Sequence, residues 1–123
     1  MMDWEIVGEA ENGKVAIELT KTLKPDLVIL DVSMPGMSGL DVVRAIRDSG
    51  NHAKILLLTL HDAHELIRNA FRLGINGFLL KTDPEEELVH ALRVVVGGGV
   101  YLSPKLDPDF AKRIITNIAS DFC

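Results

Sequence analysis

Residues 26–40, DLVILDVSMPGMSGL, contain the pattern that decides the fold. Four consecutive apolar residues, Leu27 to Leu30, are followed directly by the carboxylate of Asp31 and then by a loop rich in glycine and proline. An apolar run without alternation is typical of a parallel strand that is covered on both faces. The stretch therefore predicts a buried strand that ends in one exposed but well-positioned carboxylate.

Two further apolar runs of the same kind follow along the chain. Residues 55–58 end at Thr59, and residues 78–80 end at Lys81. A shorter strand candidate, Trp4 to Val7, lies near the N-terminus, and segments with helical spacing of apolar residues separate these runs. Strands that alternate with helices predict an α/β domain with a mostly parallel sheet and right-handed crossovers.

Asp31, Thr59 and Lys81 each stand at the carboxyl end of a predicted strand. Because the carboxyl ends of parallel strands meet at the same edge of a sheet, we expect the three side chains to lie close together. A carboxylate can attack a phosphoryl group and form an acyl phosphate, while an ammonium and a hydroxyl group stabilise the charge on the phosphoryl oxygens. Surface polarity explains any one of these residues alone, but the set predicts a phosphoryl-transfer site.

The composition limits the classes of protein to which this chain can belong. With 123 residues, of which 47% are apolar and 25% charged, we expect one soluble globular domain. The net charge of −5 and the lack of clustered Lys and Arg argue against nonspecific binding to nucleic acid or anionic membranes. The single cysteine, Cys123, cannot form an internal disulfide, and no apolar run approaches the ~18 residues of a membrane span. These features predict a cytoplasmic protein.

Three motifs together resemble the receiver domains of two-component response regulators. They are DLVILDVSMPGMSGLD around Asp31, LLLTLHD around Thr59 and GFLLKT around Lys81. A fourth stretch, GGGVYLSP, resembles the linker of the subgroup that carries LuxR-type (NarL/FixJ-like) helix-turn-helix output domains. The resemblance covers about residues 4–105 and implies a flavodoxin-like, doubly wound parallel sheet.

The resemblance also implies a role for individual residues. Asp31 would accept a phosphoryl group from the phosphohistidine of a kinase, and Thr59 and Lys81 would contact the phosphoryl oxygens. Phe78 would be the aromatic residue whose rotamer follows the switch. Two positions would tune the lifetime of the phosphoryl group, each two residues beyond a strand end: Ser33 and His61.

A receiver domain is a phosphoprotein that acts as a signalling switch rather than as an enzyme with a substrate of its own. The resemblance therefore implies regulation of transcription through an output domain that is not present in this sequence. The implied partners are a histidine kinase and a second copy of the chain. DNA would be reached only through the absent helix-turn-helix domain, and no membrane is involved.

Two other functions stay open. A degenerate receiver that is never phosphorylated would serve as a dimerisation or protein-interaction module. A hydrolase or phosphatase would use Asp31 as its nucleophile. Haloacid-dehalogenase-like enzymes would require a second Asp two residues later, where this chain has Ser33.

The sequence departs from the family at its N-terminus. The family begins with a strand that ends in an acidic pair, which binds Mg²⁺ together with the phosphoacceptor, and this strand and its helix have no counterpart here. We therefore predict a truncated flavodoxin-like sheet with an open edge on residues 27–30. Of the expected Mg²⁺ ligands only Asp31 remains, and the candidate substitutes for the acidic pair are Glu9 and Glu11.

Three explanations for the missing unit are open. The sequence is truncated, or a partner chain completes the sheet through swapping or strand addition, or the strand at residues 4–7 shifts into the gap. In the third case Glu9 or Glu11 would replace the acidic pair.

We divide the chain into an incomplete receiver domain at residues 1–103 and a linker or extra helix at residues 104–123. Phe110, Ile114 and Ile118 form an apolar stripe with helical spacing in the second part. This stripe has no obvious partner within the domain. The tail is therefore either a linker helix toward an absent output domain or an element of dimerisation or swapping.

Overall fold

The computed structural model describes residues 4–33 and 36–121, with side chains described as far as Thr116. Its centre is a parallel sheet in the order β1-β2-β3-β4. The strands are β1 (Leu27–Asp31), β2 (Lys54–Thr59), β3 (Gly77–Leu80) and β4 (Tyr101–Leu102). The predicted α/β fold with a flavodoxin-like parallel sheet is confirmed.

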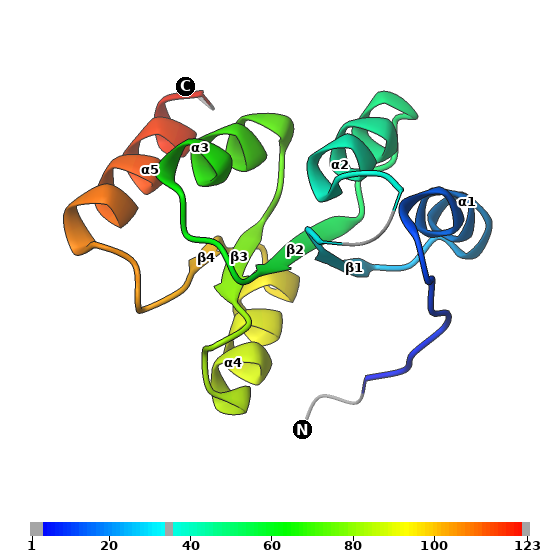
Figure 1. The fold of residues 1–123 in the computed structure, drawn as a ribbon, viewed down its shortest axis with the longest axis horizontal. Coiled ribbons are helices and arrows are strands. Elements are labelled where there is room, and N and C mark those ends of the chain that lie inside the picture. The colour runs from blue at the N-terminus through cyan, green and yellow to red at the C-terminus, as the bar shows by residue number, and fades with distance from the viewer. Residues whose placement is uncertain (1–3, 34–35, 122–123) are drawn as a thin grey trace.

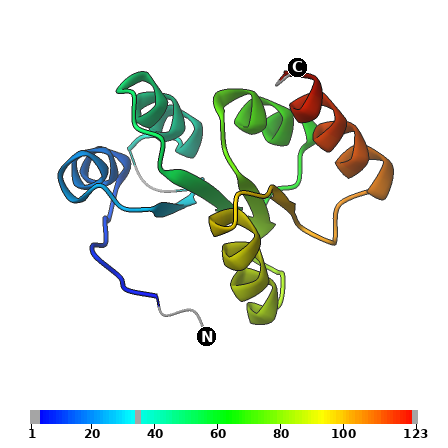
Figure 2. The ribbon, with the colours of Figure 1, turned by 180° about the vertical axis from the view of Figure 1, so that it is seen from behind.

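Helices cover both faces of this sheet (Figure 1; Figure 2 shows the reverse side). One helix, α4, lies on one face, and the other four helices lie on the opposite face. The helices are α1 (Gly13–Leu23), α2 (Gly39–Asp48), α3 (His64–Leu73), α4 (Glu85–Val96) and α5 (Pro108–Asp121). This alternation of strands and helices brings the carboxyl ends of β1, β2 and β3 to one edge of the sheet.

Local side chains determine where the first two helices begin. Asn12 caps α1 by accepting a hydrogen bond from the backbone N–H of Val15, and Ser38 caps α2 by accepting one from Asp41. α3 differs, because its N-cap residue is Ala63, which has no side-chain acceptor. The first N–H groups of α3 therefore have no side-chain acceptor on the N-cap residue.

The main core lies between the sheet and the face covered by four helices. Its largest fully buried side chains include Phe78, Leu30, Ile46 and Ile67. A smaller cluster between the sheet and α4 contains Leu56, Leu79 and Ala91. β2 and β3 are thus buried on both faces, which explains why their sequences are uniformly apolar.

The predicted strand at residues 4–7 and the predicted open edge on β1 have different outcomes. Residues 4–7 form no strand, and the side chains of Trp4, Ile6 and Val7 are exposed. The predicted strand is wrong, because a strand requires a paired edge and its backbone finds none. The open edge on β1 is confirmed, since within the described residues β1 pairs with β2 alone.

Burial of β1 is incomplete as a result of its edge position. The apolar run predicted a strand covered on both faces, but Ile29 is 44% exposed. α2 and the core cover Leu30, while within the described residues no helix shields the opposite face at this strand. The prediction of full coverage is therefore wrong for Ile29.

The C-terminal segment is more closely joined to the domain than its sequence indicates. The predicted helix is present as α5, but Phe110 and Ile114 are buried in the main core beside α3, so the prediction of an unpartnered stripe is wrong for these two residues. The side chain of Ile118 lies outside the described side chains. The division into residues 1–103 and 104–123 stays a prediction.

β4 is an addition that sequence patterns did not predict, because two residues are too few to show a period. It pairs with β3 in parallel, and the hydroxyl group of Tyr101 donates a hydrogen bond to Glu87 of α4. Burial of Tyr101 and the carboxylate of Glu87 raise the pKa of Tyr101 to about 12. Residues 101–102 are thereby attached to both β3 and α4.

Candidate functional site

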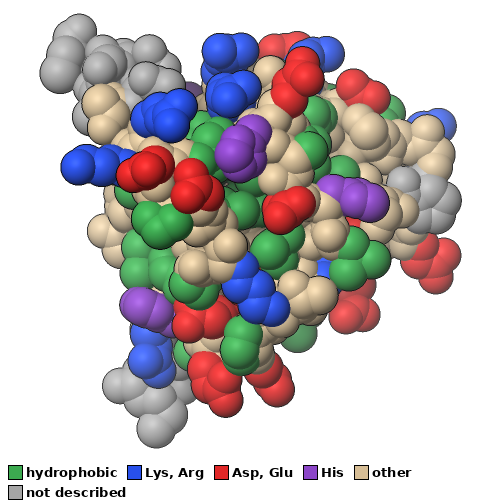
Figure 3. Space-filling view, turned by 60° about the vertical axis from the view of Figure 1, so that its left-hand side comes forward, with side chains coloured by type: hydrophobic (Ala, Val, Ile, Leu, Met, Phe, Trp, Pro, Cys, Tyr) green, Lys and Arg blue, Asp and Glu red, His purple; other side chains and the backbone are tan. Residues whose placement is uncertain are grey.

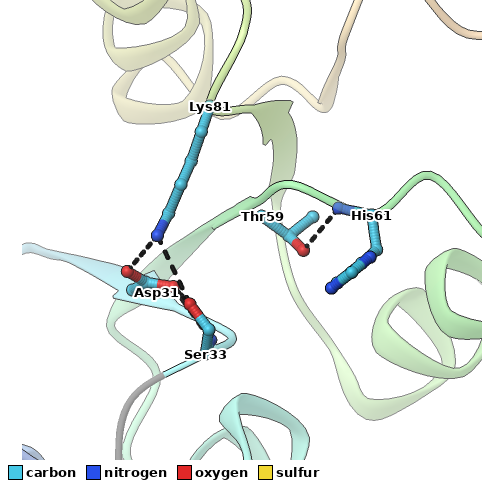
Figure 4. Close-up of polar contacts among 5 residues, drawn as sticks. All are labelled: Asp31, Ser33, Thr59, His61 and Lys81. Atoms are coloured by element: carbon cyan, nitrogen blue, oxygen red, sulfur yellow. Dashed lines mark hydrogen bonds and ion pairs between the residues drawn. The ribbon is translucent and has the colours of Figure 1, made fainter.

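Asp31 stands at the carboxyl end of β1 and faces Lys81, which follows β3 (Figure 4). The ammonium group of Lys81 forms an ion pair with Oδ2 of Asp31. Ser33 donates to the other oxygen, Oδ1, from both its backbone N–H at 2.8 Å and its Oγ at 2.7 Å. Lys81 Nζ also lies 3.3 Å from Ser33 Oγ, so the three residues form one connected polar group.

This polar group stabilises the ionised form of Asp31. Partial burial raises the pKa of the carboxyl group, but hydrogen bonds from Lys81 and Ser33 and the positive charge of Lys81 together outweigh burial. The pKa of Asp31 therefore lies below its ordinary value of 3.8. Because its side chain is still 38% exposed, the carboxylate is both ionised at neutral pH and reachable from solvent.

Thr59 lies at the end of β2, beside this group but not hydrogen-bonded to it. Its side chain is buried, and its Oγ1 accepts a hydrogen bond from the backbone N–H of His61 at 3.0 Å. The backbone carbonyl of Thr59 accepts from the N–H of Lys81 at 2.8 Å, which joins the ends of β2 and β3. The structure thus places Thr59 and His61 next to the polar group formed by Asp31, Ser33 and Lys81 (Figure 4).

Phe78 occupies the middle of β3 and is fully buried in the main core. Its backbone carbonyl accepts a hydrogen bond from the N–H of Ser103 at 2.8 Å. Its predicted role as a switch residue stays a prediction. The burial of Phe78 shows that any change of rotamer would disturb core packing.

The described part of the chain contains no set of side chains suited to bind Mg²⁺. Residues 4–33 and 36–121 contain no group of three or more His, Cys, Asp or Glu side chains that could hold a metal ion. Glu9 and Glu11 are exposed and do not join Asp31 in such a group. The carboxylate oxygens of Asp31 are instead engaged by Lys81 and Ser33. The residues present therefore do not fit the expected cation.

The loop after Lys81 contains residues that sequence reasoning missed. Asp83 Oδ2 accepts from the N–H of Leu80 at 2.9 Å, and Asp83 Oδ1 accepts from Ser103 Oγ at 3.0 Å. Lys105 Nζ donates to the carbonyl of Thr82 at 2.6 Å. A sequence pattern could suggest Asp83 as a helix start, but no local signal connects it with a serine 20 residues away.

Comparison with known proteins assigns the family. The family model described as the response regulator receiver domain matches residues 2–93. The chain belongs to this family. Receiver domains are signalling modules, and members of the family generally bind Mg²⁺.

Individual relatives of the receiver domain agree with this assignment. The transcriptional regulatory protein YdfI of Bacillus subtilis is 39% identical over 111 residues, which cover 90% of this chain and 50% of YdfI. The nitrate/nitrite response regulator protein NarL of Escherichia coli K12 is 36% identical over 118 residues, which cover 96% of this chain and 55% of NarL. The receiver chain thus spans about half the length of the curated relatives it matches.

A solved structure supports the fold of the receiver domain. The crystal structure of a two-component response regulator of the LuxR family from Aurantimonas sp. SI85-9A1 superposes with a TM-score of 0.77 at 30% identity. The alignment covers 93% of this chain and 79% of that chain. The predicted resemblance to LuxR-type receivers is confirmed.

Among the helices of the described residues, none has the length and apolar character required to cross a membrane.

Proposed function

We propose that this receiver domain is a phosphorylation switch that accepts a phosphoryl group on Asp31 from the phosphohistidine of a histidine kinase. The observation that carries the proposal is the state of Asp31, an ionised and half-exposed carboxylate held at the end of β1 by Ser33 and Lys81. A nucleophile in phosphoryl transfer must be unprotonated, positioned and reachable, and Asp31 meets these three requirements.

The proposed step transfers one phosphoryl group between two side chains. An oxygen of Asp31 forms the new P–O bond while the P–N bond of the phosphohistidine breaks, and the electron pair of that bond stays on the imidazole nitrogen. Lys81 then neutralises part of the charge on the phosphoryl oxygens, and Thr59 donates its hydroxyl hydrogen to one of them. Ser33 and His61, which flank the group, would tune how long the acyl phosphate survives.

The output of the switch is proposed from the relatives. YdfI is described as a transcriptional regulatory protein and NarL as a response regulator, and each is about twice as long as the matched region. We propose that this chain likewise controls transcription through an output domain outside its sequence. DNA contact would then belong to that output domain, in agreement with the net charge of −5 here.

The proposal is tested by treating the purified chain with acetyl phosphate in a buffer that contains MgCl₂. We expect the intact mass to increase by one phosphoryl group, and peptide mapping to place that group on Asp31. The Asp31→Asn variant keeps the size of the side chain and serves as the control that must not be modified. An unchanged mass in the wild-type chain, or equal modification of the variant, would contradict the proposal.

A second candidate function is an interaction module that works without phosphorylation. The observation that favours it is the ion pair itself, because Lys81 already neutralises Asp31 in the unmodified chain. This candidate predicts that Asp31→Asn leaves the oligomeric state unchanged at every protein concentration. Phosphorylation of Asp31 accompanied by a change of conformation would exclude it.

A further inference from the structure

The outer edge of β1 carries backbone groups with which no strand of the described residues pairs. The carbonyl of Asp26, just before β1, accepts a hydrogen bond from β2 at 3.0 Å, and the N–H of Val32, just after β1, donates one to β2 at 3.1 Å. The direction of the backbone groups alternates along a strand, so the residues at odd positions point away from β2. They are Leu27, Ile29 and Asp31, and their N–H and C=O groups form an open pairing edge.

Exposed apolar surface lies directly beside this edge. Val28 and Leu30 pack into the main core, whereas Ile29 points to the opposite face and is 44% exposed. On that face α4 packs against β2, β3 and β4, so the described residues leave much of Ile29 uncovered. A strand added to the edge of β1 would therefore form backbone hydrogen bonds and cover an apolar side chain at the same time.

Residues 4–7, here called the N-terminal arm, have the composition of a strand but no strand partner in the described part of the chain. Their three apolar side chains are exposed, Ile6 at 79%. Side chains of an extended segment point alternately to opposite sides, so Trp4 and Ile6 share one side and Glu5 and Val7 share the other. Each copy of the chain thus contains an unpaired apolar segment as well as an unpaired edge.

The packing of the residues that follow the arm directs it away from the edge of its own copy. Gly8 lies so close to α1 that a Cβ at this position would be 2.7 Å from Cδ1 of Leu23. Ala10 packs against the main core. These contacts hold the chain on the α1 side, and the arm runs clear of β1 in both ribbon views (Figure 1 and Figure 2). The arm and the edge of one copy therefore stay apart while these contacts persist.

We propose that the edge of β1 binds the N-terminal arm of a second copy of the chain, which adds a strand to the sheet. The two-residue period of both strands then places Trp4 and Ile6 beside Ile29, on the face that α4 leaves open. Val7 lies on the side of Val28, next to the main core. Each copy has one arm and one edge, so a reciprocal exchange closes a symmetric dimer in which neither element stays unpaired.

The face of the molecule shown in Figure 3 suits an apolar strand less well. Acidic, basic and histidine side chains lie there among the hydrophobic ones. An apolar segment placed on this face would cover charged groups without giving them partners, which costs free energy. The edge of β1 offers backbone groups and an apolar side chain that match the arm, and its pairing does not depend on a phosphoryl group at Asp31.

Direct pairing of two β1 edges is the competing arrangement. It would cover Ile29 in both copies but leave Trp4 and Ile6 exposed, whereas the exchange of arms covers all three side chains. The exchange therefore removes more apolar surface from water and is favoured on that ground.

Complementation between two variants of the whole chain tests the inference. Ile6→Lys places a charge on the arm and leaves the edge intact, and Ile29→Lys does the reverse. Sedimentation velocity should show that each variant self-associates at least about tenfold more weakly than the wild-type chain, because a lysine opposes strand pairing. An equimolar mixture should associate at least about tenfold more tightly than either variant alone. A mixed dimer keeps one contact free of substitutions, whereas every contact between copies of one variant carries a lysine.

Native mass spectrometry identifies the mixed dimer if one of the two variants is labelled with nitrogen-15. Ile115→Lys introduces the same charge at a 52% exposed position on α5 and is the control, which should associate like the wild-type chain. Unweakened association of Ile6→Lys would overturn the inference and favour pairing of two β1 edges. A wild-type chain that stays monomeric at every concentration, or a mixture no tighter than its components, would overturn it as well.

Disulfide cross-linking tests the arrangement of the side chains. In a Cys123→Ser background, copies with Trp4→Cys or Ile6→Cys are mixed with copies with Ile29→Cys and oxidised. Side chains on the same face of neighbouring strands are close enough for a disulfide, so we expect a mixed dimer in which peptide mapping finds the two introduced cysteines joined. Glu5→Cys, on the other side of the arm, should lose this product. Equal yields from all three arm positions would overturn the proposed pairing.

Discussion

At the scale of single residues, Asp31 is controlled by two opposing influences. Burial favours its neutral form, while Lys81 and Ser33 favour its ionised form and prevail. Ser33 contributes twice, through its backbone and its hydroxyl group, and so fixes the orientation of the carboxylate as well as its charge. The same two neighbours that prepare Asp31 as a nucleophile also occupy its oxygens.

The Lys81→Met variant should raise the pKa of Asp31, because the effect of burial remains while the main hydrogen bond and charge are lost. Ser33→Ala should raise it by less, since Lys81 contributes more than the serine hydroxyl. Carbon-13 NMR titration of the carboxyl group measures both changes. Lys14→Met, which removes an exposed lysine, is the control. A pKa that stays the same in Lys81→Met would show that the ion pair does not form in solution.

The lowered pKa of Asp31 predicts how the stability of the fold depends on pH. The folded-state pKa of Asp31 is lowered, so its ion pair stabilises the fold fully above the ordinary pKa of 3.8 and ceases to do so as the pH falls through the lower folded-state value. The difference in unfolding free energy between the wild-type chain and Lys81→Met should therefore be constant near neutral pH and disappear in strong acid. Urea unfolding at several pH values measures it.

At the scale of elements, Arg47 connects α2 with the end of α3, away from the Asp31 site. Its guanidinium group donates from Nε at 3.1 Å and Nη2 at 2.8 Å to the carbonyl of Gly74, and from Nη1 at 3.0 Å to the carbonyl of Asn51. Gly74 ends α3 in a left-handed conformation with φ of 103°, which glycine adopts at little cost. One side chain of α2 thus holds the end of α3 at the amino ends of the strands.

Arg47→Met should lower the free energy of unfolding by about 2 kcal/mol, because it leaves partly buried carbonyls without their charged donor. Arg44→Met is the matched control on the same helix. Arg44 is 60% exposed and lies 4.0 Å from Asp41, so its loss should cost less than about 1 kcal/mol. Urea denaturation of both variants checks the difference. Equal losses would mean that the contacts of Arg47 contribute no more than those of an exposed arginine.

At the scale of the whole molecule, the sheet ends in an open edge. Within the described residues, β1 has no partner beyond β2, Ile29 is 44% exposed and Ile6 is 79% exposed. Unpaired backbone groups beside exposed apolar side chains favour pairing with another chain. We therefore expect the open edge to favour self-association, independently of Asp31.

We expect the chain to self-associate as its concentration rises, and Ile29→Lys to weaken this association by at least about tenfold, because a lysine on an edge strand opposes pairing. Sedimentation velocity over a range of concentrations measures the effect. Val89→Lys, which introduces the same charge at a 39% exposed position on α4, is the control. Association that responds equally to both substitutions would locate the contact elsewhere.

Much of the candidate site follows from local sequence. Uniform apolar runs predicted the strands that became β1, β2 and β3, and the polar residues at or directly after their carboxyl ends predicted the grouping of Asp31, Thr59 and Lys81 at one edge. These features depend on neighbouring residues and on the geometry common to all parallel sheets, so periodicity was sufficient to find them.

Long-range contacts were decided only by the tertiary structure. Lys81 reaches Asp31 across the intervening strand β2, Ser103 meets Asp83, and Phe110 finds a place beside His64. Sequence patterns carry no information on such distances, because the same residues could face solvent in another packing arrangement.

Residues 4–7 show that a sequence pattern can also predict a strand that the tertiary structure does not form. Trp4 to Val7 have the composition of a strand, yet they remain unpaired although β1 has an open edge, because strand formation depends on pairing with a neighbour as well as on side chains. The sequence by itself determined which segments could become strands and which residues stand at their ends. The tertiary structure decided which of them pair and which side chains meet, because pairing and burial are properties of the partner as much as of the segment.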